Sequence, residues 1–112
     1  MSTEKAKKHY LGQDNHARLN CAHAVLKAFE NVVGVDLNYK CKGGGQSPGG
    51  ECGALCAAKE ILSIKNPQKI TEIEIAFRET AGSTKCLDIR RNRKLSCLGC
   101  VEKAAMFVEE NI

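Results

Sequence analysis

Apolar residues recur every three to four positions between Asp14 and Val33, which is the spacing of one face of an α-helix. Asp14 suits the N-cap position, and Gly34 suits the residue that ends such a helix. The pattern predicts a helix over residues 14–33, with Cys21 in its middle and on the side facing the core. The apolar stripe comprises Ala17, Cys21, Ala24, Val25, Ala28, Phe29 and Val32.

Two further helices follow a glycine-rich segment, residues 36–50, which we expect to be a loop. The first runs from about Glu51 to about Ile64, because Asn66-Pro67 interrupts the pattern. The second begins at Thr71, which forms a capping-box signature with Glu74, and ends near Gly82. Its inward residues are expected to be Ile70, Ile73 and Phe77.

The C-terminal third predicts two more helices. A brief one follows a turn and is capped by Ser83 or Thr84, and the last begins at Ser96 or Cys97 and continues to about Glu110. No segment alternates between apolar and polar residues as a half-buried strand does. We therefore expect an all-α fold, a small bundle of about four to five helices with a Gly-rich loop. The last helix has an apolar stripe of Val101, Ala104, Ala105 and Val108.

Composition adds limits to this picture. A chain of 112 residues is one domain by size, here a helical domain over residues 14–112 that follows an N-terminal segment, residues 1–13. Only 4% of the residues are aromatic, so the core must consist of small aliphatic residues and cysteine. A helical homodimer would be one way to cover remaining apolar surface. No apolar stretch has the length of a signal peptide or membrane span, which favours a cytoplasmic protein.

The net charge of +4 is modest, but the basic residues are clustered. The densest cluster is the run R-R-N-R-K over residues 90–94. It has no interleaved aromatic residues for base stacking, so nucleic-acid binding is not favoured. A solvated loop is the simplest interpretation. Alternatively, these charges, together with Lys85, offset a nearby anionic centre or dock an acidic redox partner.

Seven cysteines are the main chemical signal, and four of them form close pairs. Cys52 and Cys56 are separated by three residues, and Cys97 and Cys100 by two, near the starts of predicted helices. Such spacings place both side chains of a pair on one helix face. A helix N-terminus also stabilises thiolates. Two such pairs together would form a four-thiolate site for zinc or for an iron–sulfur cluster.

Other residues could complete or modify that site. Cys21 or Cys86 could replace a member of either pair, and spacing alone does not choose the ligand set. Cys41, within the glycine-rich loop, is more readily explained as an incidental thiol. Gly43, Gly44 and Gly45 could bring backbone N–H groups close to a cofactor, or could simply permit turns. No serine triad or paired-carboxylate signature indicates a hydrolase, so the sequence does not establish an enzymatic activity.

Five short motifs in succession resemble the C_GCAxxG_C_C family, whose members are regarded as redox proteins. They are N-C-A-x-A-V from Asn20, a G-G-G loop, E-C-G-A-L from Glu51, G-S-T-K-C from Gly82, and C-V-x-x-A-A from Cys100. The resemblance covers nearly all of the chain from about Asp14. It implies a small, mostly helical protein with four signature cysteines, which by matching motifs are Cys21, Cys52, Cys86 and Cys100.

The chain departs from the family pattern in two ways. Ala57 stands where the C-G-A-x-x-G motif closes with glycine, and Cys56 before it adds a thiol. Cys97 adds another thiol beside Cys100. Both extra cysteines are additional candidate ligands or resolving thiols. The resemblance also implies an association with iron–sulfur binding.

Three functions are compatible with these observations. The leading hypothesis is an iron–sulfur protein for electron transfer or redox sensing, working with a redox partner protein. The second is a metal-free thiol–disulfide oxidoreductase in which Cys97 or Cys100 supplies a thiolate of low pKa, and Cys52, Cys56 or Cys86 resolves the mixed disulfide. The third is a zinc-stabilised binding module that uses its basic stretch.

Overall fold

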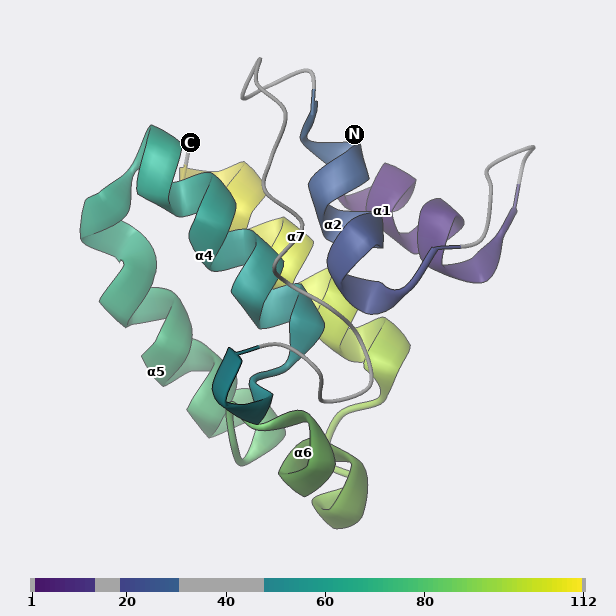
Figure 1. Cartoon of the computed structure of the whole chain (residues 1–112), viewed down its shortest axis with the longest axis vertical. Coiled ribbons are helices and arrows are strands. Elements are labelled where there is room, and N and C mark those ends of the chain that lie inside the picture. The colour runs from purple at the N-terminus through teal and green to yellow at the C-terminus, as the bar shows by residue number, and fades with distance from the viewer. Residues whose placement is uncertain (1, 14–18, 31–47, 112) are drawn as a thin grey trace.

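Six α-helices and two short 3₁₀ turns make up the residues that the computed structural model describes, which are 2–13, 19–30 and 48–111. Within these ranges no strand is present, and the fold is an all-α bundle, as the sequence predicts. Figure 1 shows α4 and α7 side by side, with α6 at one end of the bundle. The helices are α1 (Ser2–Leu11), α2 (Cys21–Ala28), α4 (Gly53–Lys65), α5 (Ile70–Ala81), α6 (Cys86–Asn92) and α7 (Cys97–Asn111).

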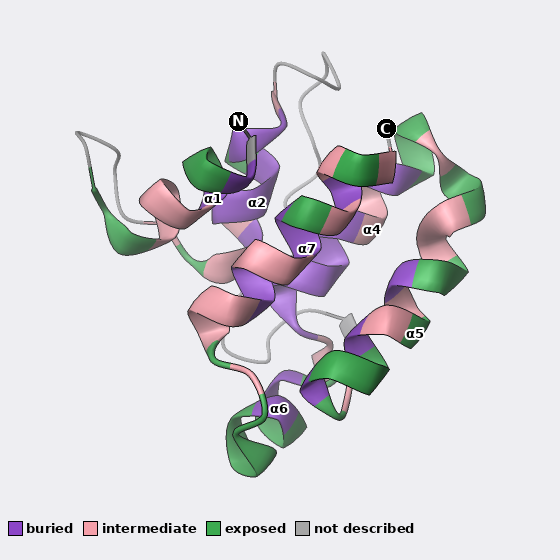
Figure 2. Cartoon of the chain, turned by 180° about the vertical axis from the view of Figure 1, so that it is seen from behind, coloured by how far each residue is buried: buried purple, intermediate pink, exposed green. Residues whose placement is uncertain are grey.

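The core lies where α2, α4 and α7 pack against one another (Figure 2). Small side chains dominate the contact, which lets the helix backbones approach closely. Larger residues such as Phe29 and Phe77 fill the remaining space, and the predicted stripe of α7 is buried throughout. Among the fully buried residues of these three helices are Ala22, Ala24, Ala54, Ala57, Ala58, Ala104 and Ala105.

Helix α1 was not expected from the sequence. It packs on α7 and α2 through the fully buried Ala6. Polar contacts also tie it to α7: the Thr3 hydroxyl donates to Glu109 Oε2 at 2.6 Å, and Lys7 Nζ lies 2.9 Å from Glu102 Oε2. A helix that contributes so little apolar surface gives a weak periodic signal, which explains why the pattern did not reveal it.

The first residue of α2 is Cys21, so the expectation that this cysteine lies in mid-helix was wrong. The reason is the residue before it. Asn20 has an extended backbone, and its side-chain oxygen accepts a hydrogen bond from the His23 backbone N–H at 2.9 Å. Asparagine is among the strongest N-cap residues. The N-cap predicted at Asp14 lies outside the described residues.

The capping box predicted for α5 does not form. A 3₁₀ turn, Pro67–Lys69, runs directly into α5, so Lys69 occupies the N-cap position without a side-chain cap and Thr71 lies inside the helix. Glu74 binds Lys59 of α4 instead, with 3.2 Å between Oε1 and Nζ. The turn therefore places the N-cap two residues earlier than the signature indicated.

The N-cap of α6 is Lys85 rather than Ser83 or Thr84. Ser83 Oγ instead accepts a hydrogen bond from the Lys85 backbone N–H at 3.0 Å, which closes the turn before the helix. The carbonyl of Thr84 accepts from the Cys52 backbone N–H at 2.8 Å. The turn is thus used to connect two distant segments rather than to cap α6.

Gly82 ends α5 as predicted, in a left-handed conformation with φ of 82°. A Cβ atom at this position would lie 2.7 Å from Asn92 Nδ2. Asn92 in turn donates from Nδ2 to the Ala81 carbonyl at 3.0 Å. Glycine therefore allows the end of α6 to pack closely against the end of α5.

The predicted loop over residues 36–50 is described only at its end, where Pro48–Gly50 form a 3₁₀ turn. Gly43, Gly44 and Gly45, and also Cys41, lie outside the described residues. In the described part of the chain, no helix combines the length and apolar character needed to cross a membrane.

Candidate functional site

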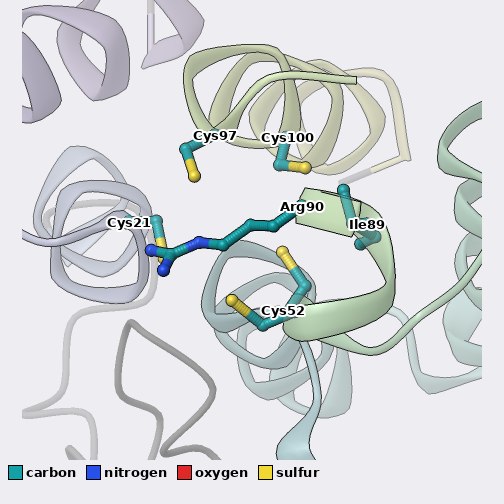
Figure 3. Close-up of a pocket in the computed structure, with 7 residues that line it drawn as sticks. Cys21, Cys52, Ile89, Arg90, Cys97 and Cys100 are labelled. Atoms are coloured by element: carbon teal, nitrogen blue, oxygen red, sulfur yellow. The ribbon is translucent and has the colours of Figure 1, made fainter. Parts of the chain in front are cut away.

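One pocket gathers five of the seven cysteines, and none of these five forms a disulfide. The pocket encloses about 300 Å³, including space open to solvent. Figure 3 shows Cys97 and Cys100 of α7 on one side of the pocket and Cys21 and Cys52 on the other, with the Cys97 sulfur directed into the space between them. The lining residues come from α2, α6, α7 and the start of α4: Cys21, Cys52, Cys86, Ile89, Arg90, Cys97 and Cys100.

Four of the five pocket cysteines lie at the start of a helix. Cys21 and Cys97 are the first residues of α2 and α7, Cys52 is the N-cap of α4, and Cys86 is the first residue of α6. Cys100 lies one turn into α7. The positive ends of the helix dipoles therefore lie near the pocket, and the Ala54 and Leu55 N–H groups at the start of α4 bind the sulfur of Cys52. This arrangement stabilises negative charge in the pocket.

The starts of α4 and α6 are held together by the backbone. Glu51 and Lys85 form an isolated antiparallel bridge, and the Cys52 N–H donates to the Thr84 carbonyl. Lys85 Nζ also donates to the carbonyl of Gly49 at 2.6 Å. These contacts place the N-cap of α4 beside the start of α6. They explain how cysteines that are 34 positions apart in the sequence line one pocket.

Glu51 precedes Cys52, but its carboxylate is bound to another side chain. Glu51 Oε2 lies 2.9 Å from Lys59 Nζ, and the same ammonium group binds Glu74. The network joins the residue before α4 to α4 itself and to α5. Glu51 therefore supports the position of Cys52 and is not among the pocket-lining residues.

Cys52 and Cys100 form a polarised pair. The Cys100 thiol donates a hydrogen bond to Cys52, and the backbone N–H groups of Leu55 and Ala54 add to it, so the pKa of Cys52 falls to about 7 despite burial. The pKa of Cys100 is raised well above its usual range, because its proton is held by Cys52 and because the side chain is buried. The expectation of a low pKa at Cys100 was therefore wrong, since this residue is the donor of the pair.

Cys21 resists ionisation. Burial, followed by repulsion from the thiolate of Cys52, raises the pKa of Cys21 to about 11, although the Ala54 N–H acts in the opposite direction. Several thiolates within one small pocket repel each other. The pocket can therefore hold several anionic sulfurs only when a cation compensates them, or it can lose the charge by forming a disulfide.

Arg90 supplies one cationic group at this pocket. Its side chain extends across the cysteines, with the guanidinium group near Cys21 (Figure 3). A hydrogen bond to Cys97 and the charges of Cys86 and Cys97 raise the pKa of Arg90. The sequence indicated only that the basic run lies near the cysteines. The structure identifies the one arginine of the run that lines the pocket.

Cys56 lies outside the pocket although it follows Cys52 by one turn. Cys56 is disulfide-bonded and belongs to the hydrophobic core, with 6% of its surface exposed. Cys52 has φ of −55° and ψ of 128°, so it lies before the regular helix rather than on its face. The spacing rule for helix faces therefore does not apply to this pair.

The arrangement limits the metal chemistry of the pocket. Among the described residues, no group of three or more His, Cys, Asp or Glu side chains could hold a single metal ion. A tetrahedral zinc ion binds sulfur at about 2.3 Å, so its sulfur ligands lie within roughly 4 Å of each other. The five thiols are donors of the type that iron–sulfur clusters require, since the irons of such a cluster are each bound by different cysteines. They are equally suited to disulfide exchange.

Comparison with protein families gives a match over most of the chain. The profile described as "Putative redox-active protein (C_GCAxxG_C_C)" matches residues 19–111. The comparisons with curated proteins and with solved structures gave no significant match. The matched region begins just before Cys21 and includes every pocket residue. The chain therefore belongs to the C_GCAxxG_C_C family of redox-active proteins.

Proposed function

We propose that the five-cysteine pocket binds an iron–sulfur cluster and that the protein serves in electron transfer or redox sensing. The observation that supports this most strongly is the convergence of five cysteines that form no disulfide, from four separate chain segments, on one pocket. Remote cysteines brought together in this way are typical of a site for a group that bridges them. Membership of a redox-active family agrees with the proposal.

The four signature cysteines are the proposed ligands: Cys21, Cys52, Cys86 and Cys100. A bound iron–sulfur cluster supplies a reversible electron couple whose potential depends on nearby charge, hydrogen bonds and solvent exposure. Cys97 is the fifth thiol and contacts Arg90. We assign Cys97 to the rim of the pocket, as a hydrogen-bonding neighbour rather than a ligand.

The surrounding residues stabilise the charge of four thiolates. The Leu55 and Ala54 N–H groups at the start of α4 bind the sulfur of Cys52, the Ala54 N–H also acts on Cys21, and Arg90 adds a full positive charge. Ile89, only 3% exposed, forms an apolar part of the wall and limits the approach of water. These features favour the anionic ligands on which metal binding depends.

The test is iron and acid-labile sulfide analysis of protein purified and reconstituted without oxygen, together with the visible absorption spectrum. We expect a brown protein with stoichiometric iron and sulfide. Alanine at any signature cysteine should reduce bound iron by about tenfold or more, since loss of a ligand removes a metal–thiolate bond. Cys97→Ala should retain the iron. This variant is the matched control, because it removes a pocket cysteine that is not a proposed ligand.

A protein without iron or sulfide after reconstitution would overturn the proposal. Full iron in all four signature variants would overturn the assigned ligand set. Zinc in a stoichiometric amount, with no redox activity, would instead favour a zinc-stabilised module.

Thiol–disulfide exchange is the second candidate, favoured by the hydrogen-bonded pair of Cys52 and Cys100. In this reaction the Cys52 thiolate attacks a substrate disulfide and releases one substrate thiolate, which takes up a proton. Cys100, after losing its proton, attacks the mixed disulfide. The products are a Cys52–Cys100 disulfide and a reduced substrate dithiol. Peptide mapping of iron-free protein after incubation with a disulfide substrate tests this candidate function. Only thiol–disulfide exchange requires a Cys52–Cys100 disulfide to form.

A further inference from the structure

The outer side of α6 is exposed while its inner side lines the pocket. Cys86 and Ile89 are buried, whereas Leu87 between them has 62% of its surface exposed, the largest fraction among the exposed large hydrophobic residues of the described chain. The exposed residues are on the outer side of α6 in Figure 2. The short helix α6 therefore exposes an apolar residue, Leu87, on its outer side and lines the cysteine pocket with its inner side.

Positive charge surrounds this apolar residue. Residues 85–94 contain five basic residues and one acidic residue, a net charge of +4, which equals the net charge of the whole chain. The remaining residues of the chain therefore have a combined net charge of zero. Arg91, Arg93 and Lys94 are exposed, and within the described residues none of them forms an ion pair. Their charge remains available to an external partner.

Arg90 connects the charged surface to the pocket. It belongs to the same short helix, is exposed, and lines the pocket beside the cysteines. A partner bound at α6 would consequently lie next to the redox site. Transient redox complexes use small interfaces, and complementary charge accelerates and orients their encounter.

We infer that the α6 surface, defined as Leu87, Arg90, Arg91, Arg93 and Lys94, docks an acidic redox protein that exchanges electrons with the pocket. The redox character of the partner rests on the proposed function, whereas the acidic character rests on the charge of the surface. A nucleic acid suits this surface less well, because its centre is an exposed leucine and α6 has only seven residues and no aromatic side chain.

Calorimetric titration of the full chain tests the inference. The acidic probe is a flavodoxin, and a basic c-type cytochrome of similar size is the oppositely charged comparison. We expect flavodoxin to bind, the affinity to fall as ionic strength rises through about 0.1 M, and the cytochrome not to bind. Arg91→Glu should weaken flavodoxin binding by about fivefold or more at low salt. Leu87→Ser should weaken it at low and high salt alike, because its contribution is not electrostatic.

Lys65→Glu is the matched control. It makes the same change of charge at the exposed last residue of α4, which is the end opposite Cys52. It should leave the affinity unchanged within twofold. Equal effects of Arg91→Glu and Lys65→Glu, no flavodoxin binding at low salt, or binding of a short DNA duplex with higher affinity than flavodoxin would each overturn the inference.

The measurement distinguishes this inference from the proposed function. The affinity for flavodoxin is measured with and without bound iron, and we expect it to be the same in both forms. Absence of iron with α6-dependent binding would therefore reject the cluster and retain the docking surface. Bound iron without α6-dependent binding would retain the cluster and reject the docking surface.

Discussion

Two cysteines with similar burial differ in acidity because their hydrogen bonds differ. Cys52 is the N-cap of α4, so its sulfur accepts hydrogen bonds from backbone N–H groups as well as from Cys100. Cys100 lies further along α7, where its own N–H is bound to the Ser96 carbonyl at 2.8 Å. The helix start therefore stabilises the thiolate at Cys52, and the thiol at Cys100 acts as donor.

Alkylation of iron-free protein with iodoacetamide should report this difference. Because a lowered pKa means that the proton is lost at a lower pH, labelling of Cys52 should reach half its maximal rate near pH 7 and decrease below it. An ordinary thiol does so about 1.5 pH units higher. Cys100→Ala removes the thiol that donates a hydrogen bond to Cys52. It should therefore raise the midpoint of Cys52 labelling by about one pH unit. Peptide mass spectrometry identifies the labelled site.

Cys97→Ala is the control for this experiment, since Cys97 is not among the groups that shift Cys52. It should leave the midpoint unchanged. A midpoint for Cys52 near that of a free thiol would contradict the assigned pair.

At the scale of the element, turns decide where the pocket helices begin and end. Asn20 starts α2 at Cys21, and the hydrogen bond to Ser96 Oγ from the Gly99 N–H, 2.9 Å, fixes the start of α7 at Cys97. Gly82 ends α5 and brings Asn92 against it. The orientation of α6, and with it that of Cys86, follows from these junctions.

Gly82→Ala should lower the free energy of unfolding by about 2 kcal/mol. About half arises from a left-handed backbone conformation at a residue with a Cβ atom, and the rest from displacement of Asn92 and loss of its bond to the Ala81 carbonyl. Gly50→Ala is the matched control. Gly50 also has a positive φ, 74°, but a Cβ atom added there would meet no other atom within 4 Å. It should cost about 1 kcal/mol.

Denaturant unfolding of both variants measures the difference. Equal losses in the two variants would show that the contact with Asn92 contributes nothing to the junction of α5 and α6.

At the scale of the whole molecule, α1 completes the core although it precedes the region matched to the family. It covers α7 and α2, and Ala6 is fully buried between them. Because α2 and α7 both carry pocket cysteines, a stable contact with α1 helps to hold these two helices together. The family match begins at residue 19, so this helix lies outside the matched region.

Ala6→Gln should destabilise the fold by about 2–3 kcal/mol, because a larger polar side chain must enter a fully packed contact. Lys5→Gln alters the adjacent exposed residue and should change stability by no more than about 0.5 kcal/mol. Thermal unfolding followed by circular dichroism compares the two. An equally small effect of both substitutions would mean that α1 does not pack as described.

Much of the fold could be predicted from local patterns. The apolar stripe of α7, the inward Ile73 and Phe77, and the stop at Gly82 are confirmed, because each depends on periodicity or on one residue's backbone preference. Predictions failed where another part of the chain competes with the local signal. The 3₁₀ turn at Pro67 displaced the capping box at Thr71, and the weakly apolar α1 gave no clear pattern.

The sequence by itself determined the helical class and the family, and its resemblance to that family indicated four signature cysteines, because periodicity and motifs are properties of neighbouring residues. Tertiary structure alone decided that Cys97 joins these four in one pocket while Cys56 does not. It also decided that Arg90 is the pocket arginine and that Cys52 is the acidic thiol of its pair. These properties depend on distances and hydrogen bonds between remote segments, which no local pattern contains.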